Sequence, residues 1–502
     1  MKGMALLNLN AAPLSIGALT HSFASMPAGF YARQAPSPVA DPAMVVFNDA
    51  LAAELSLDTV SCPLEALTAI FAGNALPTGA DPIAMAYAGH QFGHFTPQLG
   101  DGRAILLGEV IDRAGSRRDI QLKGAGRTAF SRGGDGRAAL GPVLREYLIS
   151  EAMHALGVPT TRALAAVTTG EAVLRDRPLP GAVLTRIAAS NIRVGTFQYF
   201  AARGDYDAVE ALADYVIDRH YADARQAENP YLALLEAVVA RQASLVARWL
   251  NLGFVHGVMN TDNMAVSGET IDYGPCAFID AYDPATVFSS IDDYGRYAFK
   301  NQPAMAQWNL TRFAETLVPL LGDDEQDNIA CATRAIMGFG AAFDNAWLAG
   351  MRCKLGLTIA EDGDRALAQS LLAAMHKDAV DFTLCFRMLG EGLDGASARA
   401  RVLFQDKDAF DHWREAWHQR CARESMPVGL RAASMRAENP AVIPRNHIVE
   451  QVLAAATRQG DYAPFHECLG VLLDPYTDRP AHARYAEPPA PGQSILRTFC
   501  GT

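Results

Sequence analysis

The stretch His256-Gly-Val-Met-Asn-Thr-Asp-Asn263, followed closely by Asp272-Tyr-Gly274, is the most informative part of this 502-residue chain. Residues 231–252, just before it, carry apolar side chains at helical spacing and end at Gly253, so they predict a long helix. Asp and Asn side chains therefore stand in a loop that directly follows a buried helix. Oxygen-bearing side chains in such a loop are candidates for a functional site.

The spacing within this stretch matches one pattern of phosphotransferase. Enzymes of the protein-kinase fold carry a metal-binding Asn seven residues after a His and then, beyond a short hairpin, an Asp-Phe-Gly variant. Counted from His256, the Asn falls on Asn263, and Asp272 follows two predicted short strands, 264–266 and 270–271. A carboxylate and an amide oxygen, with phosphate oxygens, suit Mg²⁺. Asn263 and Asp272 are therefore predicted to bind a divalent metal.

The same loop departs from the kinase pattern at its third position. Val258 stands where the catalytic Asp belongs, and a valine cannot accept a proton from a substrate hydroxyl. A carboxylate reappears at Asp262, which is a candidate for a displaced base. Because Asp and Asn also favour loops and helix caps, Asp262 and Asn263 taken alone are equally well explained as capping residues.

A second group of candidates lies upstream. Two apolar runs, 104–111 and 119–123, predict a β-hairpin that ends at Lys123. In kinases such a lysine binds phosphates and is held by a helix carboxylate. A helix predicted over 142–156 offers Glu146, which shares a row with apolar side chains, so its charge is expected to face the interior. An exposed lysine and a solvated glutamate remain the alternative for either residue alone.

Glycine-rich segments surround this hairpin at 87–94, 98–103 and 131–137. Glycine lets backbone N–H groups approach phosphates, and the arginines between them can pair with those phosphates. Hairpin turns alone would explain most of these glycines. Arg186 and Arg193 form a further basic pair, for which an ordinary surface position is the alternative.

The predicted elements form a β-rich half followed by a helical half. An early helix is predicted over 42–55, and helices with loops run from about 292 to 470. We expect an α+β protein with a kinase-like two-lobed fold and extensions at both ends. Its expected parts are an N-terminal extension (1–86), a β-rich lobe (87–185), a helical lobe (186–360) and a helical C-terminal region (361–502).

Composition narrows the class of protein. The formal net charge of −12 argues against a nucleic-acid partner, because phosphate backbones favour a basic surface. No apolar run reaches the roughly 18 residues needed to cross a bilayer, and no secretory signal is evident. We expect a soluble, cytoplasmic protein with neither a nucleic-acid nor a membrane partner. The eight cysteines lack C-x-x-C spacing, so no zinc site is predicted.

Taken together, these motifs resemble the selenoprotein O family, pseudokinases that transfer AMP from ATP to protein hydroxyls. The likeness runs from about Phe23 to the C-terminus and rests on several long, ordered motifs. They are Tyr87-Ala-Gly-His-Gln-Phe-Gly93, Gln121-Leu-Lys-Gly-Ala-Gly126, His256–Asn263 and Asp272-Tyr-Gly-Pro275. In many members the third residue from the end is selenocysteine, where this chain has Cys500.

The resemblance implies how the nucleotide is held. ATP would bind in a flipped orientation that leaves its α-phosphate open to attack. Lys123 would hold phosphates and pair with Glu146, while Arg186 and Arg193 would clamp the γ-phosphate. Further nucleotide contacts would come from Gly100, Gly102, Arg103, Asp135 and Gly136.

The resemblance also implies the chemistry. Asn263 and Asp272 would bind Mg²⁺ or Mn²⁺, with Asp272 also facing the nucleotide, and Asp262 would act as base. The acceptors would be Ser, Thr or Tyr hydroxyls of proteins, including this chain itself, and pyrophosphate would leave. Whether UTP replaces ATP is left open.

Two other functions remain possible at this point. One is a phosphotransferase that uses Asp262 as its base, against which the valine at position 258 weighs. The other is a nucleotide-binding scaffold without turnover, against which the full pair of metal ligands, Asn263 and Asp272, weighs. A regulatory disulfide between Cys276 and Cys500 would tether the tail across the nucleotide site, and two free thiols are an equally good expectation.

Overall fold

The computed structural model describes residues 14–59, 61–391, 393 and 398–499, and the protein is of the α+β class. The described residues form two compact units. The first contains the residues up to Ala86 with Gln98–Val143 and Arg162–Asn191. The second contains Tyr87–Pro97, Leu144–Thr161 and the residues from Ile192 onward. Each unit has its own hydrophobic core.

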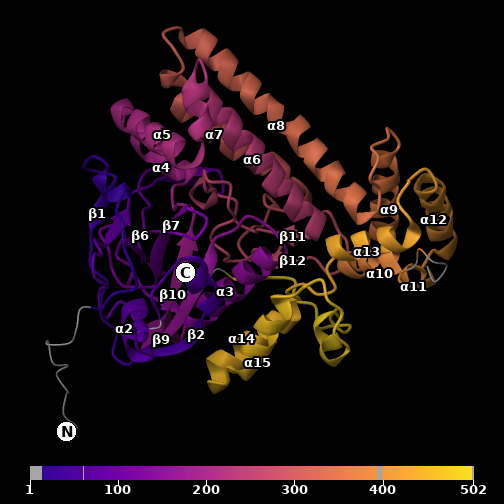
Figure 1. Ribbon diagram of the computed structural model, residues 1–502, viewed down its shortest axis with the longest axis horizontal. Coiled ribbons are helices and arrows are strands. Elements are labelled where there is room, and N and C mark those ends of the chain that lie inside the picture. The colour runs from indigo at the N-terminus through magenta and orange to yellow at the C-terminus, as the bar shows by residue number, and fades with distance from the viewer. Residues whose placement is uncertain (1–13, 60, 392, 394–397, 500–502) are drawn as a thin grey trace. The chain divides into compact units, whose positions relative to one another are not determined.

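The first unit is built on an antiparallel sheet in the order β1-β3-β6-β7-β10-β9-β2, with β8 paired to β10 (Figure 1). Helix α2 (Leu64–Ala72) packs on β9 and β10 and buries Ile70 and Phe71. The strands are β1 (Tyr31–Arg33), β2 (Ala43–Phe47), β3 (Ile83–Met85), β6 (Ala104–Ile111), β7 (Arg117–Lys123), β8 (Ala138–Ala139), β9 (Arg162–Leu174) and β10 (Pro178–Ala188).

The predicted hairpin ending at Lys123 is confirmed as β6 and β7, with Ala104 opposite Lys123. Its turn is closed by Asp112, whose carboxylate accepts hydrogen bonds from the N–H groups of Ala114 (3.0 Å) and Ser116 (2.8 Å). A side chain that mimics a backbone turn in this way is a typical Asp role. The closed turn therefore helps to hold β6 and β7 in register with each other.

The predicted helix over 42–55 is wrong in its first half. Residues Ala43–Phe47 form β2, which pairs with β9, because the run Met-Val-Val-Phe favours a pleated, half-buried surface. Helix α1 (Asp49–Glu54) begins only after Asn48, whose side chain accepts a hydrogen bond from the Leu51 N–H at 3.0 Å.

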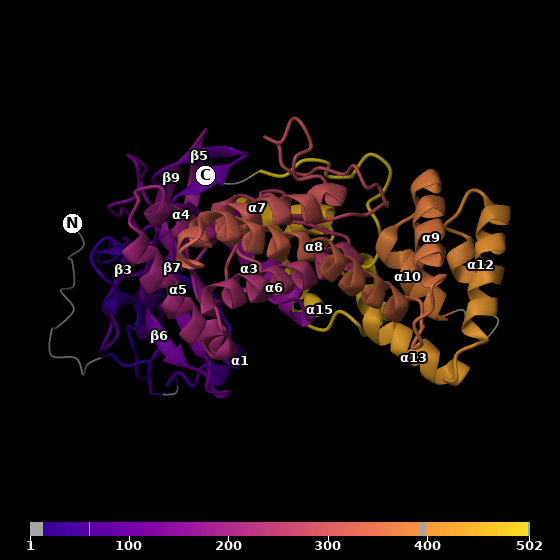
Figure 2. The same cartoon turned by 90° about the horizontal axis from the view of Figure 1, so that it is seen from above.

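The second unit is mainly helical, and α6, α7 and α8 lie side by side in both views (Figures 1 and 2). Helix α6 matches its prediction, with Pro230 in its first turn and left-handed Gly253 as its cap. These three helices and the helices before them are α3 (Leu140–Ala155, of which the part from Leu144 belongs here), α4 (Val194–Ala201), α5 (Tyr206–His220), α6 (Pro230–Leu252), α7 (Gln302–Leu317) and α8 (Glu325–Lys354).

Helix α6 is long and apolar enough to cross a membrane by length and composition. Half of its most apolar window is nevertheless buried inside the unit. Its stripe includes Gln242, whose amide donates to the Ala265 carbonyl at 2.8 Å. The helix therefore has the contacts of a core helix next to the candidate site.

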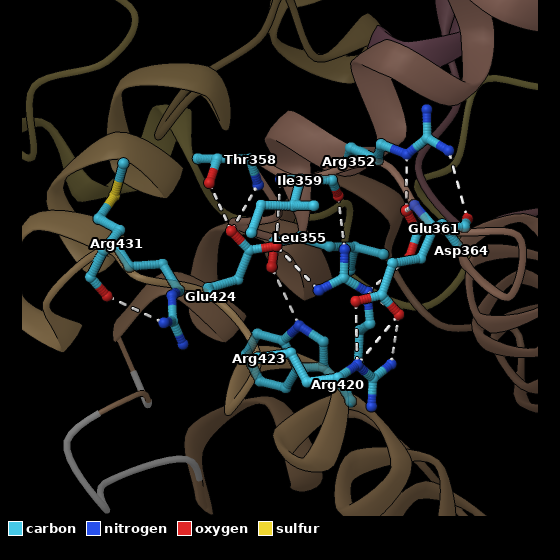
Figure 3. A network of polar contacts seen from close by, with 12 residues as sticks. Arg352, Leu355, Thr358, Ile359, Glu361, Asp364, Arg420, Arg423, Glu424 and Arg431 are labelled. Carbon is cyan, nitrogen blue, oxygen red and sulfur yellow. Dashed lines mark hydrogen bonds and ion pairs between the residues drawn. The ribbon is translucent and has the colours of Figure 1, made fainter.

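The C-terminal helices of this unit hold a network of charged side chains, drawn in Figure 3. Arg420 donates to Asp364 (2.7 Å) and to Glu424 (2.8 Å) and so joins α12 to the start of α9. The helices after α8 are α9 (Asp364–Asp378), α10 (Phe382–Glu391), α11 (Ala398–Arg401), α12 (Lys407–Cys421), α13 (Val428–Glu438), α14 (Asn446–Gln459) and α15 (Ala463–Leu472).

The two short strands predicted over 264–266 and 270–271 do not pair with each other. Ala265 bridges to Arg193 and Thr270 bridges to Thr160, so each segment joins a different part of the second unit. The short strands in this unit are β4 (Gly89–Gln91) with β5 (His94–Thr96), and β11 (Phe254–Val255) with β12 (Ala277–Phe278). The turn at Gly268 is present, but the hairpin is not.

Candidate active site

The loop 256–263 begins at His256, whose side chain fixes its position. The His256 N–H donates to Gln302 at 2.9 Å, and its Nε2 lies 2.9 Å from the Ile271 carbonyl. Burial lowers the pKa of His256, so the ring is neutral and Nε2–H is the donor to that carbonyl. His256 therefore ties the loop to the residue immediately before Asp272.

The middle of the loop is held by segments far away in the chain. Asn260 accepts hydrogen bonds from the Phe92 N–H (3.0 Å) and from the Tyr297 hydroxyl (2.7 Å). Thr261 accepts one from the His90 N–H at 2.7 Å. Both side chains are buried, so these bonds are shielded from water. The loop is a rigid element held from two sides.

Asp262 lies in a 3₁₀ turn formed by Thr261–Asn263 and is 7% exposed. Its Oδ2 receives a long hydrogen bond (3.4 Å) from the Gln91 amide, and its Oδ1 has no hydrogen-bond partner among the described residues. Burial, with a smaller contribution from the charge of Asp272, raises the pKa of Asp262 to about 6 against the attraction of Arg193. A buried carboxylate with one free oxygen is suited to take a proton.

Gly89 is what allows Asp262 to come this close. A Cβ on Gly89 would lie 2.7 Å from Asp262 Oδ1. The glycine-rich segment 87–94 forms the β4–β5 hairpin and packs against the loop 256–263, and its predicted approach to phosphates stays a prediction. The glycine therefore makes room for a side chain of the protein itself.

Arg193 joins the two acidic positions of the site. Its Nη1 donates to the Asp262 carbonyl (2.9 Å) and to Asp272 Oδ2 (3.1 Å). The guanidinium also lies over the Tyr87 ring, 4.5 Å from the ring centroid. Arg193 precedes α4 and is 4% exposed, so the surface alternative is wrong for this residue.

Asp272 is held in a left-handed backbone conformation, with φ of 65°. Such a conformation is uncommon outside glycine, and Asp and Asn adopt it more readily than most residues. Backbone strain of this kind concentrates at functional positions. The carboxylate is thereby presented from a tight turn, beside Arg193.

Asn263 and Asp272 have the donor chemistry that a hard cation needs. The Asn263 amide nitrogen donates to the Val258 carbonyl at 3.1 Å, which leaves its carbonyl oxygen for another partner. Among the described residues, no three His, Cys, Asp or Glu side chains are grouped to hold a metal. A site with two protein oxygens would be completed by phosphates and water, as is common for Mg²⁺. The residues therefore fit a metal bound together with a nucleotide.

In the first unit, three basic residues predicted to contact the nucleotide lie on or next to strand β7: Arg103, Lys123 and Arg186. Lys123 ends β7, and the Gly124 N–H donates to the Arg103 carbonyl at 2.7 Å. Arg186 on β10 lies opposite Gln121 and donates to its side chain at 3.3 Å. Because side chains two residues apart share a face, Lys123 and Arg186 are on the same face of the sheet. Arg186 is 2% exposed, which contradicts a surface position.

The other predicted nucleotide contacts of this unit are packed closely. A Cβ on Gly100 would lie 2.3 Å from the Phe130 ring, and one on Gly102 would lie 2.9 Å from the Phe130 carbonyl oxygen. Gly136, with φ of 68°, lies against the Gly126 backbone. Asp135 forms an ion pair with Arg175 at 2.8 Å, and this hydrogen bond lowers the pKa of Asp135. Each of these residues therefore has a packing or pairing role in its own unit.

Glu146 lies in α3 and is 4% exposed, so its predicted inward orientation is confirmed. Cys276 is fully buried beside the site. Cys500 lies outside the described residues, so the disulfide stays a prediction.

Several residues that shape the site were not predicted. Gln91, Tyr297 and Gly89 contact the catalytic loop from segments that are distant in sequence. The glycines of segment 87–94 marked it as a candidate, but its partner was not readable from the sequence.

Within the second unit, a buried acidic residue, Asp262, lies next to Asn263 and shares Arg193 with Asp272, which is the arrangement expected of a nucleotidyltransferase-type site. Comparison with known proteins agrees. A family model described as "Protein adenylyltransferase SelO" matches residues 15–472. The chain therefore belongs to this family and is a nucleotidyltransferase.

Curated relatives are similar over nearly the whole chain and carry the name "Protein nucleotidyltransferase YdiU". The protein from Rhizobium meliloti (strain 1021) is 60% identical over 484 residues, covering 96% of this chain and 99% of the relative. The one from Rhizobium etli (strain CIAT 652) is 59% identical over 492 residues, covering 98% of each chain. The one from Bradyrhizobium sp. (strain BTAi1 / ATCC BAA-1182) is 60% identical over 483 residues.

Proposed function

We propose that this protein is a protein adenylyltransferase that transfers AMP from ATP to Ser, Thr or Tyr hydroxyls and releases pyrophosphate. The observation that carries the proposal is the position of Asp262. Its buried carboxylate lies in the loop that would hold the kinase base at position 258, where a valine stands, and it has an oxygen without a hydrogen bond. A base at Asp262, displaced from position 258, suits an attack on the α-phosphorus of ATP in place of the γ-phosphorus.

In the proposed reaction the acceptor hydroxyl attacks the α-phosphorus of ATP. The bond from the α-phosphorus to the oxygen that bridges it to the β-phosphorus breaks, and Asp262 accepts the hydroxyl proton. Gln91 and Gly89 position the carboxylate, and Arg193 holds the loop backbone close to Asp272. The rigid support of the loop keeps the base in place before substrate arrives.

We propose a kinase-like two-lobed arrangement, in which a β-rich lobe (87–185) and a helical lobe (186–360) bind ATP in the flipped orientation. Lys123, paired with Glu146, would bind phosphates, and Arg186 and Arg193 would bind the γ-phosphate. Both arginines are buried in the structure and so are not ordinary surface residues, which is compatible with this role. Gly100, Gly102, Arg103, Asp135, Gly136 and Asp272 would make the remaining contacts with the nucleotide.

Asn263 and Asp272 would hold the divalent metal, Mg²⁺ or Mn²⁺. When bound, such an ion would neutralise phosphate charge and favour the departure of pyrophosphate. The proposed acceptors are proteins, including this chain, in the cytoplasm, without nucleic-acid or membrane partners.

The test uses ATP labelled separately on its α- and γ-phosphates, with the purified full chain and Mg²⁺ or Mn²⁺. We expect α-label, and no γ-label, to become covalently attached to protein. Transfer of γ-label at a comparable rate would restore the phosphotransferase alternative. Tight nucleotide binding with no label attached would favour the scaffold.

A further inference from the structure

One tyrosine differs from all the others in its exposure. The chain has fifteen tyrosines, all within the described residues. Tyr294 is 99% exposed, and the next most exposed, Tyr206, is 40% exposed. A tyrosine ring usually buries much of its apolar surface, and burial of a large side chain contributes about 1.5–3 kcal/mol. Tyr294 forgoes this contribution, and its ring and hydroxyl are open to solvent.

The loop that carries Tyr294 is anchored at both ends. The Asp292 carboxylate accepts hydrogen bonds from the N–H groups of Arg296 (2.9 Å) and Tyr297 (2.8 Å). On the other side, the Ser290 N–H donates to the Thr498 carbonyl at 3.1 Å. Gly295 takes the left-handed conformation at the turn, with φ of 64°. Tyr294 is therefore presented on a short loop whose base is fixed by hydrogen bonds.

The same loop is connected to the candidate active site. Tyr297 is buried, and its hydroxyl donates to Asn260, two residues before Asp262. Tyr294 lies only three residues before Tyr297, yet its ring faces solvent. Because Asp262 is 7% exposed, a ring that is 99% exposed does not lie against it. The Tyr294 hydroxyl is close to its own site in sequence and is open to the approach of a second molecule.

Tyrosine is a suitable acceptor in this place. Its hydroxyl is carried by a rigid ring with two side-chain torsions, so it extends from the backbone at a low entropy cost. An acceptor must enter a site in which the base is buried, and a short, firmly held loop with a protruding ring has the required shape.

We propose that Tyr294 is the hydroxyl on which one copy of this protein adenylylates a second copy, an inference that rests on the proposed function. Tyr294 Oη of the acceptor copy attacks the α-phosphorus of ATP held by the other copy. The Oη–phosphorus bond forms, the bond to the β-phosphate oxygen breaks, and pyrophosphate leaves. The phenolic proton passes to Asp262 of the copy that holds ATP. The product is an AMP-tyrosine phosphodiester at position 294.

The test separates acceptor from enzyme. The enzyme is the full chain with Tyr294→Phe, which keeps every proposed catalytic residue. The acceptor is the full chain with Asp272→Ala, with Asp262→Asn as a second inactive acceptor in case the first does not fold. With α-labelled ATP, we expect label on both acceptors, mapped by peptide analysis to Tyr294. Adding Tyr294→Phe to the acceptor should reduce its labelling at least ten-fold.

The matched control is Tyr206→Phe in the acceptor, which should leave labelling unchanged. Equal labelling of acceptors with and without Tyr294, or label mapped to other hydroxyls, would overturn the assignment while the transferase activity stands. Labelling of Tyr294 in the wild-type chain that fails to pass to an inactive acceptor would overturn transfer between copies. If the wild-type chain attaches no α-label to itself or to added casein, the transferase proposal fails and the assignment of Tyr294 fails with it.

Discussion

Two buried charge clusters in the second unit are built differently. Around Arg420, three arginines and three carboxylates satisfy one another (Figure 3). The Asp364 carboxylate, for example, receives Arg420 at 2.7 Å, Arg352 at 2.6 Å and the Glu361 N–H at 2.9 Å. Around Arg193, by contrast, Asp262 Oδ1 has no hydrogen-bond partner among the described residues. The central residues of the two clusters, Arg420 with Asp364 and Arg193 with Asp262, are similarly buried, so burial alone does not separate them.

The difference indicates what each cluster does. A buried charge without full pairing costs free energy, whereas a fully paired network holds its elements in one arrangement. The Arg420 cluster joins α8, α9 and α12, and Arg420, Asp364 and Glu424 have no buried side-chain atom without a hydrogen-bond partner in the described part of the chain. The Asp262 cluster retains an oxygen for a proton and carries the strained Asp272. Removing charge from the first should therefore cost stability, and removing it from the second should cost activity.

The largest effect is expected at Asp272. Asp272→Ala removes a charged metal ligand, so adenylyl transfer should fall by about a thousand-fold or more, and metal-dependent ATP binding should weaken. Isothermal titration with and without Mg²⁺ measures the binding, and α-label incorporation measures the transfer. Asp272→Asn is the control that keeps a residue tolerant of the left-handed backbone. Wild-type rates in Asp272→Asn would show that the carboxylate charge is not required.

A substitution at Asp262 should affect adenylyl transfer without affecting ATP binding. Asp262→Asn should lower transfer by about 10²- to 10⁴-fold, because a base acts in the chemical step, and ATP affinity should change little. The midpoint temperature of thermal unfolding should not fall, since the substitution removes a buried charge that has an unpaired oxygen. A loss of ATP binding as complete as that of Asp272→Ala would contradict this division of roles.

For the paired cluster, Arg420→Met should lower the free energy of unfolding by about 3–5 kcal/mol, because it leaves two buried carboxylates with fewer partners. Transfer below the melting temperature should stay close to wild type. The matched control is Arg423→Met, whose side chain is 55% exposed and whose ion pair with Glu361 should contribute under about 1 kcal/mol. Urea unfolding measures both variants. Equal losses in the free energy of unfolding for Arg420→Met and Arg423→Met would mean that burial does not determine how much each arginine contributes to stability.

A smaller effect is expected from crowding the base. Gly89→Ala places a Cβ against Asp262 Oδ1, so the carboxylate must shift, and transfer should fall by about 10- to 100-fold. ATP binding should be retained. Gly338→Ala is the control, because a Cβ there meets nothing within 4 Å. Unchanged transfer in Gly89→Ala would show that the position of Asp262 is not critical.

The smallest effect concerns acid stability of the paired cluster. Burial alone would raise the pKa of Asp364, but the hydrogen bonds from Arg420, the Glu361 N–H and Arg352 outweigh it and lower the pKa. A lowered pKa in the folded state stabilises the protein above the unfolded pKa of about 4, and this contribution is lost as pH falls through the folded value. Urea midpoints between pH 6 and pH 2.5 should therefore decline more steeply in wild type than in Asp364→Asn. Parallel curves would contradict the shift.

Local patterns predicted much of the fold. The β6–β7 hairpin and helix α6 follow from alternation and helical spacing, and Gly253 and Lys123 fall where the patterns place them. The candidate loop 256–263 was also picked out by spacing, because its residues are close in sequence, and its catalytic role stays a prediction. In each case the information lies within about twenty residues.

The contacts that complete the site join segments far apart in the chain, and they were not predicted. The hydrogen bond from His90 to Thr261 spans 171 residues, and the bridge from Thr160 to Thr270 replaced a hairpin that local propensity favoured. Arg420 was missed for a related reason. Its helix is rich in charge, as a solvated helix would be, and only tertiary pairing reveals that this arginine is 4% exposed.

The backbone of Asp272 limits which amino acids this position can accept. Its left-handed conformation, with φ of 65°, excludes branched and bulky residues on steric grounds, while glycine and asparagine would adopt it. The proposed metal binding would set a separate requirement for a carboxylate, which glycine and asparagine lack. Glutamate meets the second requirement, but its longer side chain does not favour the first. Aspartate alone satisfies both the backbone and the carboxylate requirement. If position 272 is randomised to all amino acids, almost all active clones should therefore carry aspartate.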